Sequence, residues 1–368
     1  MTKPPEWRDS FSNRWIESFK STSVGSLCSN IQASIDAMPR APRIEELACL
    51  LHNAHILARR GPIQFTTLRD DARAAFISRV EGIDPNRFRT VNNLILKEII
   101  EGLAASRYRA LAILDILADE CVRRTDSLSP LEFADIAVAF GNLRAGDSTF
   151  WSAFASHVEQ NWDSYREDYL LYSLWSLVVM APKQVPSRFN ESILRNHPPT
   201  RVLHKVAQSL IALGRYIPHP DDDTYQYLVT SLSQFKQHAH ERDFMLELPR
   251  LIGVPPRTIF PQVVVGGFET DLVVDFGHRR LIIELDGYSH FLEGPDGGIL
   301  QGRDEFQDRV FTRLGYKIFH FPMSFKDRDE RYRSLTMLAD TLKQQARAGN
   351  APRAAYLEKL TQKSRGKV

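Results

Sequence analysis

The sequence predicts a protein of two unlike parts, an all-helical part followed by a small α/β part. In the first part the apolar residues recur at helix spacing with hardly any strand signal. After about His240 short β-rich runs alternate with helical segments. A chain of 368 residues is also long enough for about two domains. We expect a flexible leader over 1–40, a helical domain over 41–240, an α/β domain over 241–348 and a basic tail over 349–368.

The composition indicates an ordinary soluble protein. With 43% hydrophobic residues, 25% charged residues and a net charge of +2, any basic surface must be local. The cysteines Cys28, Cys49 and Cys121 are odd in number and widely spaced, so neither a disulfide framework nor a zinc cluster is expected. No apolar run is long enough to span a membrane, and the polar start does not resemble a secretory signal.

One helical hairpin is encoded with particular clarity. Ser129 as N-cap, Pro130 at the first helical position and Glu132 three residues after the cap form a capping box. Asp147 can cap a second helix after a turn that contains Gly141 and Gly146. The apolar face of the first helix is predicted to consist of Phe133, Ile136, Ala137 and Phe140.

The same apolar stripe returns further along the helical part. Its copies are separated by roughly 32 to 38 residues, a spacing typical of helix-pair repeats. The sequence therefore predicts a helical-repeat solenoid, with a non-repetitive helical bundle as the alternative. The later copies are Leu171, Leu174, Trp175 and Val178, then Leu203, Val206, Ala207 and Leu210.

The α/β part is predicted to have the element order α-β-β-β-α-β-α. Gly266 and Gly267 suit a tight turn between the first two strands, and Gly315 suits a helix C-cap. The predicted elements are a helix over Phe244–Leu251, strands over Ile259–Val265, Thr270–Phe276 and Leu281–Asp286, a helix over Arg303–Leu314, a strand over Tyr316–Phe321 and a helix over Asp327–Ala348.

The third of these strands ends in charged residues. Alternation places Glu284 and Asp286 on one face, opposite an apolar face, and charged groups are rarely buried unless they are paired or bind a metal. Asp275 ends the preceding strand, although Asp271 shares its face. We expect Asp275, Glu284 and Asp286 to converge on one Mg²⁺ or Mn²⁺ ion, with His290 placed to touch phosphate or transfer a proton. The alternative is that these acids only anchor the following turn.

The element order is the core layout of the restriction-endonuclease-like fold, whose chemistry sits where adjacent strands diverge. The residues from Asp275 through IIELDGYSHF, then Arg309, the Leu314-Gly315-Tyr316 turn and the strand Lys317–Pro322, resemble the RAP domain. RAP domains are C-terminal modules of many organelle RNA-processing proteins and are distantly similar to very short patch repair endonucleases. Residues 259–322 carry most of the match.

The sequence departs from the family pattern at three places, one of which is Met323-Ser324-Phe325, where an aromatic-rich segment normally follows. Tyr288 replaces a usual proline, and Asp286 stands where nucleases of this fold commonly have a lysine. Because relatives of the repair type use histidine instead of that lysine, the resemblance implies that His290 is the substitute.

RAP domains often follow helix-pair repeats of the FAST-kinase-like or octotricopeptide type, and Leu170–Val179 resembles a helix of those repeats. Such repeats bind single-stranded RNA along a groove. Scattered surface arginines are more often simply solvated, but several are candidates for phosphate contacts. The candidates are Arg59, Arg60, Arg107, Arg109, Arg123, Arg124 and Arg144 in the helical part and Arg309 in the RAP-like part.

Together these observations predict an RNA-binding protein whose repeats hold single-stranded RNA and whose RAP-like domain binds or cleaves it, with no membrane partner. Two other functions are a non-catalytic adaptor in RNA processing, which would also bind protein partners, and a DNA endonuclease of the repair type. The resemblance is compatible with a cytoplasmic or organellar protein, or with a bacterial protein delivered into a host cell.

Overall fold

The structure, a computed structural model, divides the chain into two compact units. Unit 1 is built from the chain up to Gln184 together with Leu292–Gln301, and unit 2 from Val185–Phe291 together with the chain from Gly302 onward. The residues described are 64–190, 201–216, 258–277, 279–287, 290–295, 298–322 and 328–347. Outside them lie the predicted leader, the tail, the helix Phe244–Leu251, Arg59 and Arg60.

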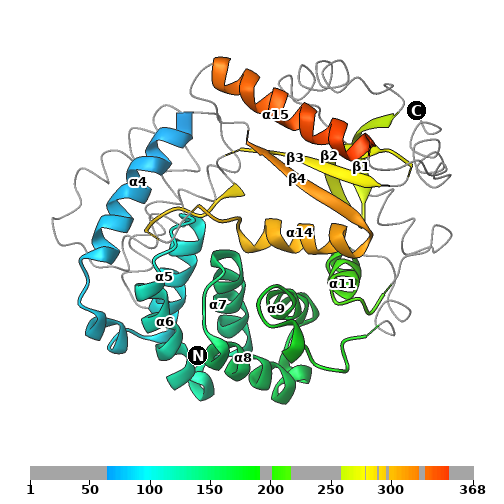
Figure 1. Ribbon diagram of the computed structural model, residues 1–368. Coiled ribbons are helices and arrows are strands. Elements are labelled where there is room, and N and C mark those ends of the chain that lie inside the picture. The colour runs from blue at the N-terminus through cyan, green and yellow to red at the C-terminus, as the bar shows by residue number, and fades with distance from the viewer. Residues whose placement is uncertain are drawn as a thin grey trace, which may run out of the picture. The chain divides into compact units, whose positions relative to one another are not determined.

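Equivalent helices of unit 1 begin at intervals of 37 residues. Helices α5, α7 and α9 start at Asn93, Pro130 and Glu167, and α6 and α8 start at Leu111 and Ser148. Helix α7 packs between α5 and α9, while α6 packs against α8 (Figure 1). The helices are α4 (Gln64–Glu81), α5 (Asn93–Ala105), α6 (Leu111–Arg123), α7 (Pro130–Leu143), α8 (Ser148–Gln160) and α9 (Glu167–Met180), with short 3-10 turns η1 (Pro85–Arg89), η2 (Thr125–Ser127), η3 (Trp162–Ser164) and η4 (Pro182–Gln184).

The ends of α5 and α7 are built alike. Each is followed by an arginine in the left-handed region, Arg107 with φ 56° and Arg144 with φ 51°. In both turns the amide after the arginine donates to the carbonyl five residues earlier, at 3.0 Å, which is the main hydrogen bond of a Schellman cap. Glycine is the usual residue at this place, because a side chain there costs roughly 1–2 kcal/mol.

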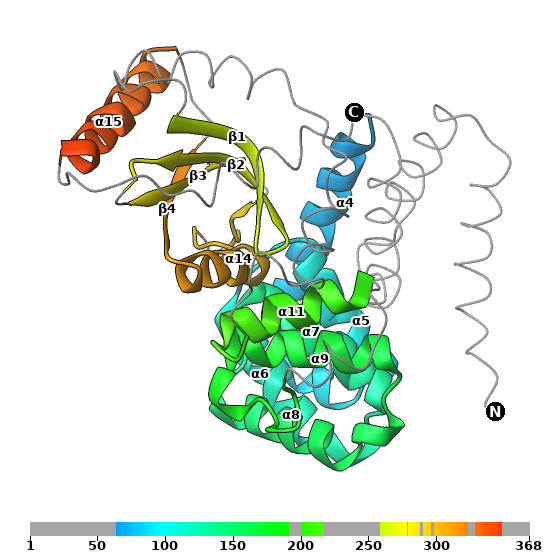
Figure 2. The same cartoon turned by 90° about the vertical axis from the view of Figure 1, so that its right-hand side faces the viewer.

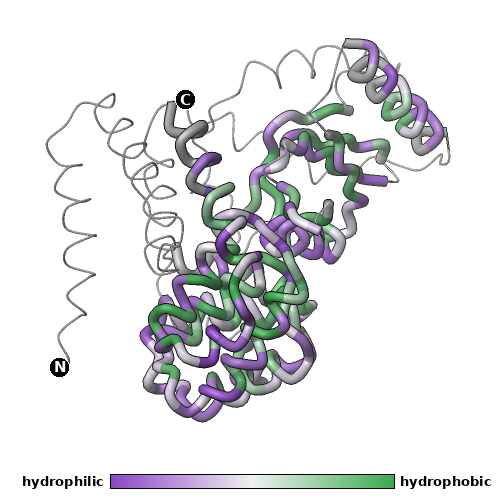
Figure 3. The backbone as a smooth tube through the Cα atoms, turned by 90° about the vertical axis from the view of Figure 1, so that its left-hand side faces the viewer, coloured by the Kyte–Doolittle hydropathy of each residue, from purple (hydrophilic) through white to green (hydrophobic). Residues whose placement is uncertain are grey.

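The predicted helical hairpin over α7 and α8 is confirmed. Ser129 and Glu132 form the capping box, and the Asp147 carboxylate accepts the Phe150 amide at 2.8 Å. Along the helices of unit 1 hydrophobic and hydrophilic residues alternate, as expected of helices with one buried stripe (Figure 3). In the hairpin that stripe is aromatic, with the rings of Phe133 and Phe154 at 4.9 Å between centroids.

The capping box offers a local test of this hairpin. Replacing Ser129 with alanine leaves the Glu132 amide without its side-chain acceptor, and we expect a loss of about 1 kcal/mol in the free energy of unfolding. Urea denaturation measures this loss. Ser148→Ala, at an exposed position in the first turn of α8, is the control and should leave the midpoint unchanged. Equal midpoints for the two variants would contradict the assigned cap.

Unit 2 contains a four-stranded mixed sheet with the order β1-β2-β3-β4. The first two pairings are antiparallel, and β4 lies parallel to β3. The sheet lies between helices α14 and α15 (Figures 1 and 2). The elements are β1 (Ile259–Val265), β2 (Phe268–Asp275), β3 (Arg280–Asp286), α14 (Gly302–Arg313), β4 (Tyr316–Pro322) and α15 (Arg328–Arg347).

The apolar face of the sheet packs on α15. Alternate residues of β2, β3 and β4 point to this helix and form one buried cluster with it. The opposite face, which carries Glu284 and Asp286, is therefore the face toward α14. The cluster on the α15 side contains Leu272, Val274, Leu281, Ile283, Leu285, Phe321, Leu338, Ala339 and Leu342.

The predicted strands and helices of this part that lie within the described residues are confirmed to within two residues at each end. Gly266 and Gly267 both have positive φ, as the tight hairpin turn requires. One element differs from the predicted domain division. Helix α11 (Arg201–Ala212), expected in the helical domain, belongs to unit 2, where the Gln208 side chain donates to the Gly267 carbonyl at 2.8 Å.

Among the helices that the structure describes, none combines the length and the apolar content needed to cross a membrane.

Candidate functional site

The strands β2 and β3 diverge at one end of their ladder. Their paired register ends at Leu272 and Ile283, whereas the parallel pairing of β3 with β4 continues to Asp286. Beyond the last pair, the Asp271 carboxylate accepts the Leu285 amide at 2.6 Å. A side chain therefore replaces the neighbouring strand as hydrogen-bond partner, and the two strands form a fork.

The edge strand is distorted beside this fork. In β1 the pairs formed by Pro261 and Val263 flank Gln262, which stands opposite Asp271 and has φ 49°. A residue other than glycine in this region costs about 1–3 kcal/mol and persists only where its surroundings impose it. Because such strain is common next to functional sites, the fork is a candidate place for chemistry.

Acidic and histidine side chains gather on the α14 side of the fork. Asp271 comes from β2, Glu284 and Asp286 from β3, and His320 from β4, beside Glu284 in the parallel register. Helix α14 contributes two carboxylates one turn apart. We call this group the acidic cluster: Asp271, Glu284, Asp286, Asp304 and Asp308, with His290 and His320.

His320 lies between two carboxylates. Its Nδ1 is 2.6 Å from Asp286 Oδ2, and its Nε2 is 2.7 Å from Asp308 Oδ2. Burial opposes the charge on the imidazole, but the bonds to Asp286 and Asp308 outweigh it and raise the pKa of His320 to about 10. Because both ring nitrogens are engaged, His320 orders the carboxylates and is poorly placed to exchange a proton.

His290 has a different arrangement. Its Nδ1 is 3.1 Å from Asp304 Oδ1 and 3.8 Å from Asp286 Oδ1. The hydrogen bond to Asp304 raises the pKa of His290 above its usual value, against the effect of burial. The Asp304 carboxylate thus fixes one side of the His290 ring, which is 31% exposed. The His320 side chain is similarly exposed, at 27%, but both of its ring nitrogens are engaged, so His290 is the better placed of the two to meet a substrate.

Glu284 and Asp304 each bury an oxygen without a donor. The side-chain atoms in this condition within the described residues are Gln184 Oε1, Glu284 Oε1 and Asp304 Oδ2, so two of the three belong to the acidic cluster. Burial, together with the charges of Asp271 and Asp286, raises the pKa of Glu284 to about 9. Glu284 therefore holds a proton at neutral pH in the absence of a cation.

The chemistry of the acidic cluster suits a hard divalent cation, which prefers carboxylate oxygens. The donor atoms are of a suitable kind, but their placement around a cation is incomplete. In the part of the chain that the structure describes, no three His, Cys, Asp or Glu side chains are already placed to hold a metal ion. His320 already contacts one oxygen of Asp286, and His290 approaches the other.

The structure does not bring Asp275 to the cluster, and this corrects the expected set of three ligands. In an antiparallel pair the end of one strand meets the start of the next, so Asp275 faces Arg280, with 3.8 Å between Oδ2 and Nε. The six residue-to-residue steps from Arg280 to Asp286 span about 20 Å of strand. Asp271, four residues earlier on the same strand face, lies at the fork instead.

Four members of the acidic cluster were not among the predicted site residues: Asp271, which was noted only as sharing the strand face of Asp275, and Asp304, Asp308 and His320. Two signals for them exist in the sequence. Asp304 and Asp308 are four residues apart, which puts both on one face of a predicted helix. His320 takes the same strand face as Glu284 once β4 is paired in parallel with β3.

Two neighbouring arginines among the candidates for RNA contact have structural partners. Arg124 is buried and donates to Glu120 Oε1 and to the backbone carbonyls of Phe88, Arg89 and Val91. It cannot also reach a ligand, which corrects its assignment as a phosphate contact. Arg123, whose side chain is 61% exposed, pairs with the same glutamate.

The remaining candidate arginines within the described residues also have partners or roles within the fold. Arg109 donates to the Leu143 carbonyl at 3.1 Å, and Arg309 pairs with Glu305 at 3.1 Å. Arg144 caps α7 in the left-handed conformation. Arg107 is ion-paired with Glu293 at 3.0 Å.

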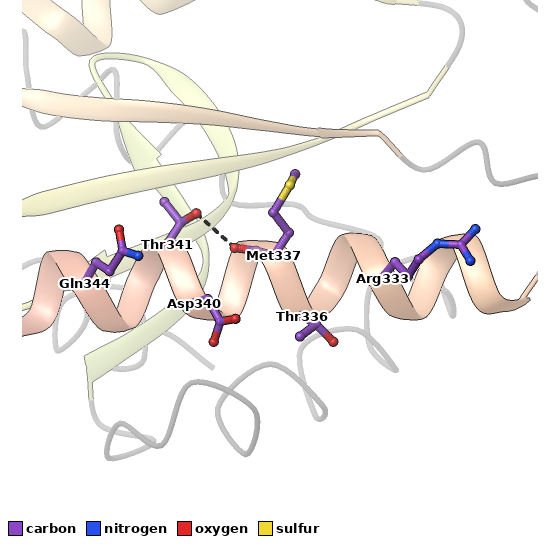
Figure 4. Close-up of a pocket in the computed structure, with 6 residues that line it drawn as sticks. All are labelled: Arg333, Thr336, Met337, Asp340, Thr341 and Gln344. Carbon is purple, nitrogen blue, oxygen red and sulfur yellow. Dashed lines mark hydrogen bonds between the residues drawn. The ribbon is translucent and has the colours of Figure 1, made fainter.

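A shallow hollow lies on helix α15 (Figure 4). It has a volume of about 540 Å³, and Met337 in its wall is 65% exposed. None of the acidic cluster lines it. The lining residues are Arg333, Thr336, Met337, Asp340, Thr341 and Gln344.

Neither a protein-family model nor a curated protein sequence matches the chain. The geometry of the acidic cluster is therefore the main guide to function.

Proposed function

We propose that the protein binds single-stranded RNA through unit 1 and cleaves it at the acidic cluster of unit 2 with the help of a divalent cation. One observation carries the proposal: at the fork of β2 and β3 the buried Glu284 Oε1 has no hydrogen-bond donor. A buried carboxylate oxygen without a partner is costly, and a cation is the partner that removes the cost. Restriction-endonuclease-like topology, which the RAP resemblance implies, puts its chemistry at such a fork.

The residues that would hold the cation are Asp286, Glu284 and Asp271. When bound, a divalent cation polarises the scissile phosphate and lowers the pKa of a nearby water. Asp286 must then exchange the His320 imidazolium for the cation, and Glu284 must lose its proton. Binding therefore competes with protons at both groups.

His290 is the group of the cluster that can transfer a proton. Asp304 orients the ring by accepting from Nδ1, which leaves Nε2 as the atom directed to other partners. With its pKa raised, His290 is protonated over a wider range than a free histidine. It can therefore donate a proton to the leaving oxygen of a phosphodiester.

The helical unit supports the choice of RNA. Helices that recur at intervals of 37 residues, with the same cap after α5 and after α7, are the pattern of stacked helix pairs. Stacked pairs place equivalent positions along one edge, at regular spacing, which suits a single strand with regularly spaced phosphates. We take unit 1 to be such a repeat array.

Cleavage of a labelled single-stranded RNA in the presence of Mg²⁺ or Mn²⁺ tests the proposal. We expect Asp286→Asn to reduce the rate by at least about 100-fold, because it removes charge at the centre of the cluster. Asp275→Asn is the matched control: it changes a carboxylate of the same sheet at the far end of β3, and its rate should equal that of the wild type. Equal losses in the two variants, or cleavage that survives in Asp286→Asn, would exclude this site.

A second function is favoured by one observation: His320 already forms a hydrogen bond with Asp286 Oδ2 and so bridges Asp286 and Asp308. If that bridge never opens, the domain is a non-catalytic RNA-binding adaptor. RNA binding without cleavage under either cation, and unaffected by Asp286→Asn, is the result expected of the adaptor. Preferential cleavage of duplex DNA would instead indicate a repair-type endonuclease.

A further inference from the structure

The segment Leu292–Gln301 is part of unit 1, although the chain on either side of it belongs to unit 2. Its backbone is fixed to the turn after α5. The Glu293 amide donates to the Arg107 carbonyl at 2.7 Å, and the Arg109 amide donates to the Glu293 carbonyl at 2.7 Å. These bonds form a short parallel bridge between Glu293 and Tyr108.

The carboxylate of Glu293 contacts two guanidinium groups. Arg107 Nη2 lies 3.0 Å from Glu293 Oε1, and Arg73 Nη2 contacts Oε2. The two arginines come from different elements, Arg73 from α4 and Arg107 from the turn after α5. Both are largely buried, with side chains 20% and 12% exposed, so the pair forms a built anion site and not a chance surface contact.

The backbone around this site is adapted to the contact. Arg107 keeps the left-handed conformation in which glycine would be more favourable, so the position is occupied by a guanidinium at a cost in stability. On the other side, Gly294 has φ 101°, and a Cβ there would lie 2.8 Å from the Arg109 carbonyl oxygen. A glycine next to Glu293 therefore allows the segment to approach closely.

We propose that Arg73 and Arg107 form a phosphate-binding site of unit 1 and that the Glu293 carboxylate occupies it until RNA displaces it. The identity of the ligand as RNA rests on the function proposed above, whereas the site itself rests on the geometry of these three residues. Arginine pairs bind carboxylate and phosphate with the same fork of N–H donors, so each anion can replace the other.

The Glu293 carboxylate acts as an internal competitor, and its effect on the affinity for an added anion can be calculated. The apparent affinity for an added anion equals the intrinsic affinity multiplied by the fraction of molecules in which Glu293 has left the site. Removing the charge of Glu293 should therefore strengthen RNA binding, while removing either arginine should weaken it.

The test compares Glu293→Gln with the wild type for binding of a fluorescein-labelled single-stranded RNA and of inorganic tripolyphosphate, without divalent cations and at one fixed salt concentration. Glutamine keeps the size of the side chain, and the two backbone bonds of residue 293 are unaffected. We expect about tenfold tighter RNA binding, equivalent to about 1.4 kcal/mol. Combining Glu293→Gln with Arg107→Gln should abolish this gain.

Asp135→Asn is the matched control, because it changes the net charge equally and removes another partly buried ion pair of unit 1, that with Lys97 at 3.1 Å. Tighter binding in Glu293→Gln alone supports the proposal, and an equal gain in both variants, or none in Glu293→Gln, overturns it. If the wild type and all variants fail to bind RNA but Glu293→Gln binds tripolyphosphate more tightly, the phosphate site stands and the proposed RNA function fails. Circular dichroism melts of each variant verify that the comparison is between folded proteins.

Discussion

Glu284→Gln is expected to stabilise the fold by on the order of 3 kcal/mol at pH 7 while it abolishes cleavage. Folding transfers Glu284 from water to a place where its pKa rises from 4.5 to about 9, so at neutral pH the folded chain must take up a proton that the unfolded chain lacks. Each pH unit above the unfolded pKa costs about 1.4 kcal/mol until the folded pKa is reached. Glutamine is neutral in both states and avoids this cost.

The sign of the pH dependence distinguishes this cause from others. Because the folded pKa is the higher one, the contribution of Glu284 to stability is fully present below pH 4.5 and is lost progressively as the pH rises toward 9. The difference between variant and wild type should therefore be close to zero near pH 4.5 and grow with pH. Urea denaturation at several pH values, in the presence of a chelator, measures it.

Glu269→Gln provides a control, since Glu269 is an exposed carboxylate on the strand next to Glu284. Because Glu269 is exposed, the pH dependence of Glu284→Gln should greatly exceed that of this control. A Glu284→Gln variant that is less stable than the wild type at pH 7 would mean that the carboxylate is ionised and paired in the folded protein. Stability gained where activity is lost is the usual relation at a functional site.

The local signals in the sequence are sufficient for most elements. Ser129, Glu132 and Asp147 predict helix ends because capping depends on a few consecutive residues, and those ends are confirmed. Gly266-Gly267 likewise predicts a turn through the backbone freedom of two residues. Where the end of a helix or a turn depends on residues within one or two turns of the chain, it can be predicted from the sequence.

The composition of the acidic cluster depends on causes that are not local. Whether Asp271 or Asp275 meets Glu284 is decided by the direction and register of β2 against β3, and the two aspartates are four residues apart on the same face. Asp304 and Asp308 join only because α14 covers that face. An antiparallel pairing of β2 with β3 is by itself enough to place Asp275 at the opposite end of β3 from Asp286, because the two strands run in opposite directions.

The burial of Arg124 likewise depends on causes that are not local in the sequence. Its sequence context, next to Arg123 at a helix end, indicates a pair of basic residues on the surface. This interpretation is correct for Arg123, which is exposed. The fold instead buries Arg124, where it donates to carbonyls of the segment that precedes α5. A side chain with several donors can form hydrogen bonds to several backbone carbonyls at once. No local sequence pattern shows which carbonyls these will be.

Arg124→Met is accordingly expected to destabilise the protein by about 3–5 kcal/mol, because it leaves the buried Glu120 with one partner fewer and removes donors from the Phe88, Arg89 and Val91 carbonyls. Arg123→Met removes the exposed partner of the same glutamate and should leave the urea midpoint nearly unchanged. The double variant Arg124→Met and Glu120→Met should recover part of the loss, since no charge is then buried alone. Near-equal effects of Arg124→Met and Arg123→Met would show that Arg124 reaches the solvent after all, and would return it to the candidates for RNA contact.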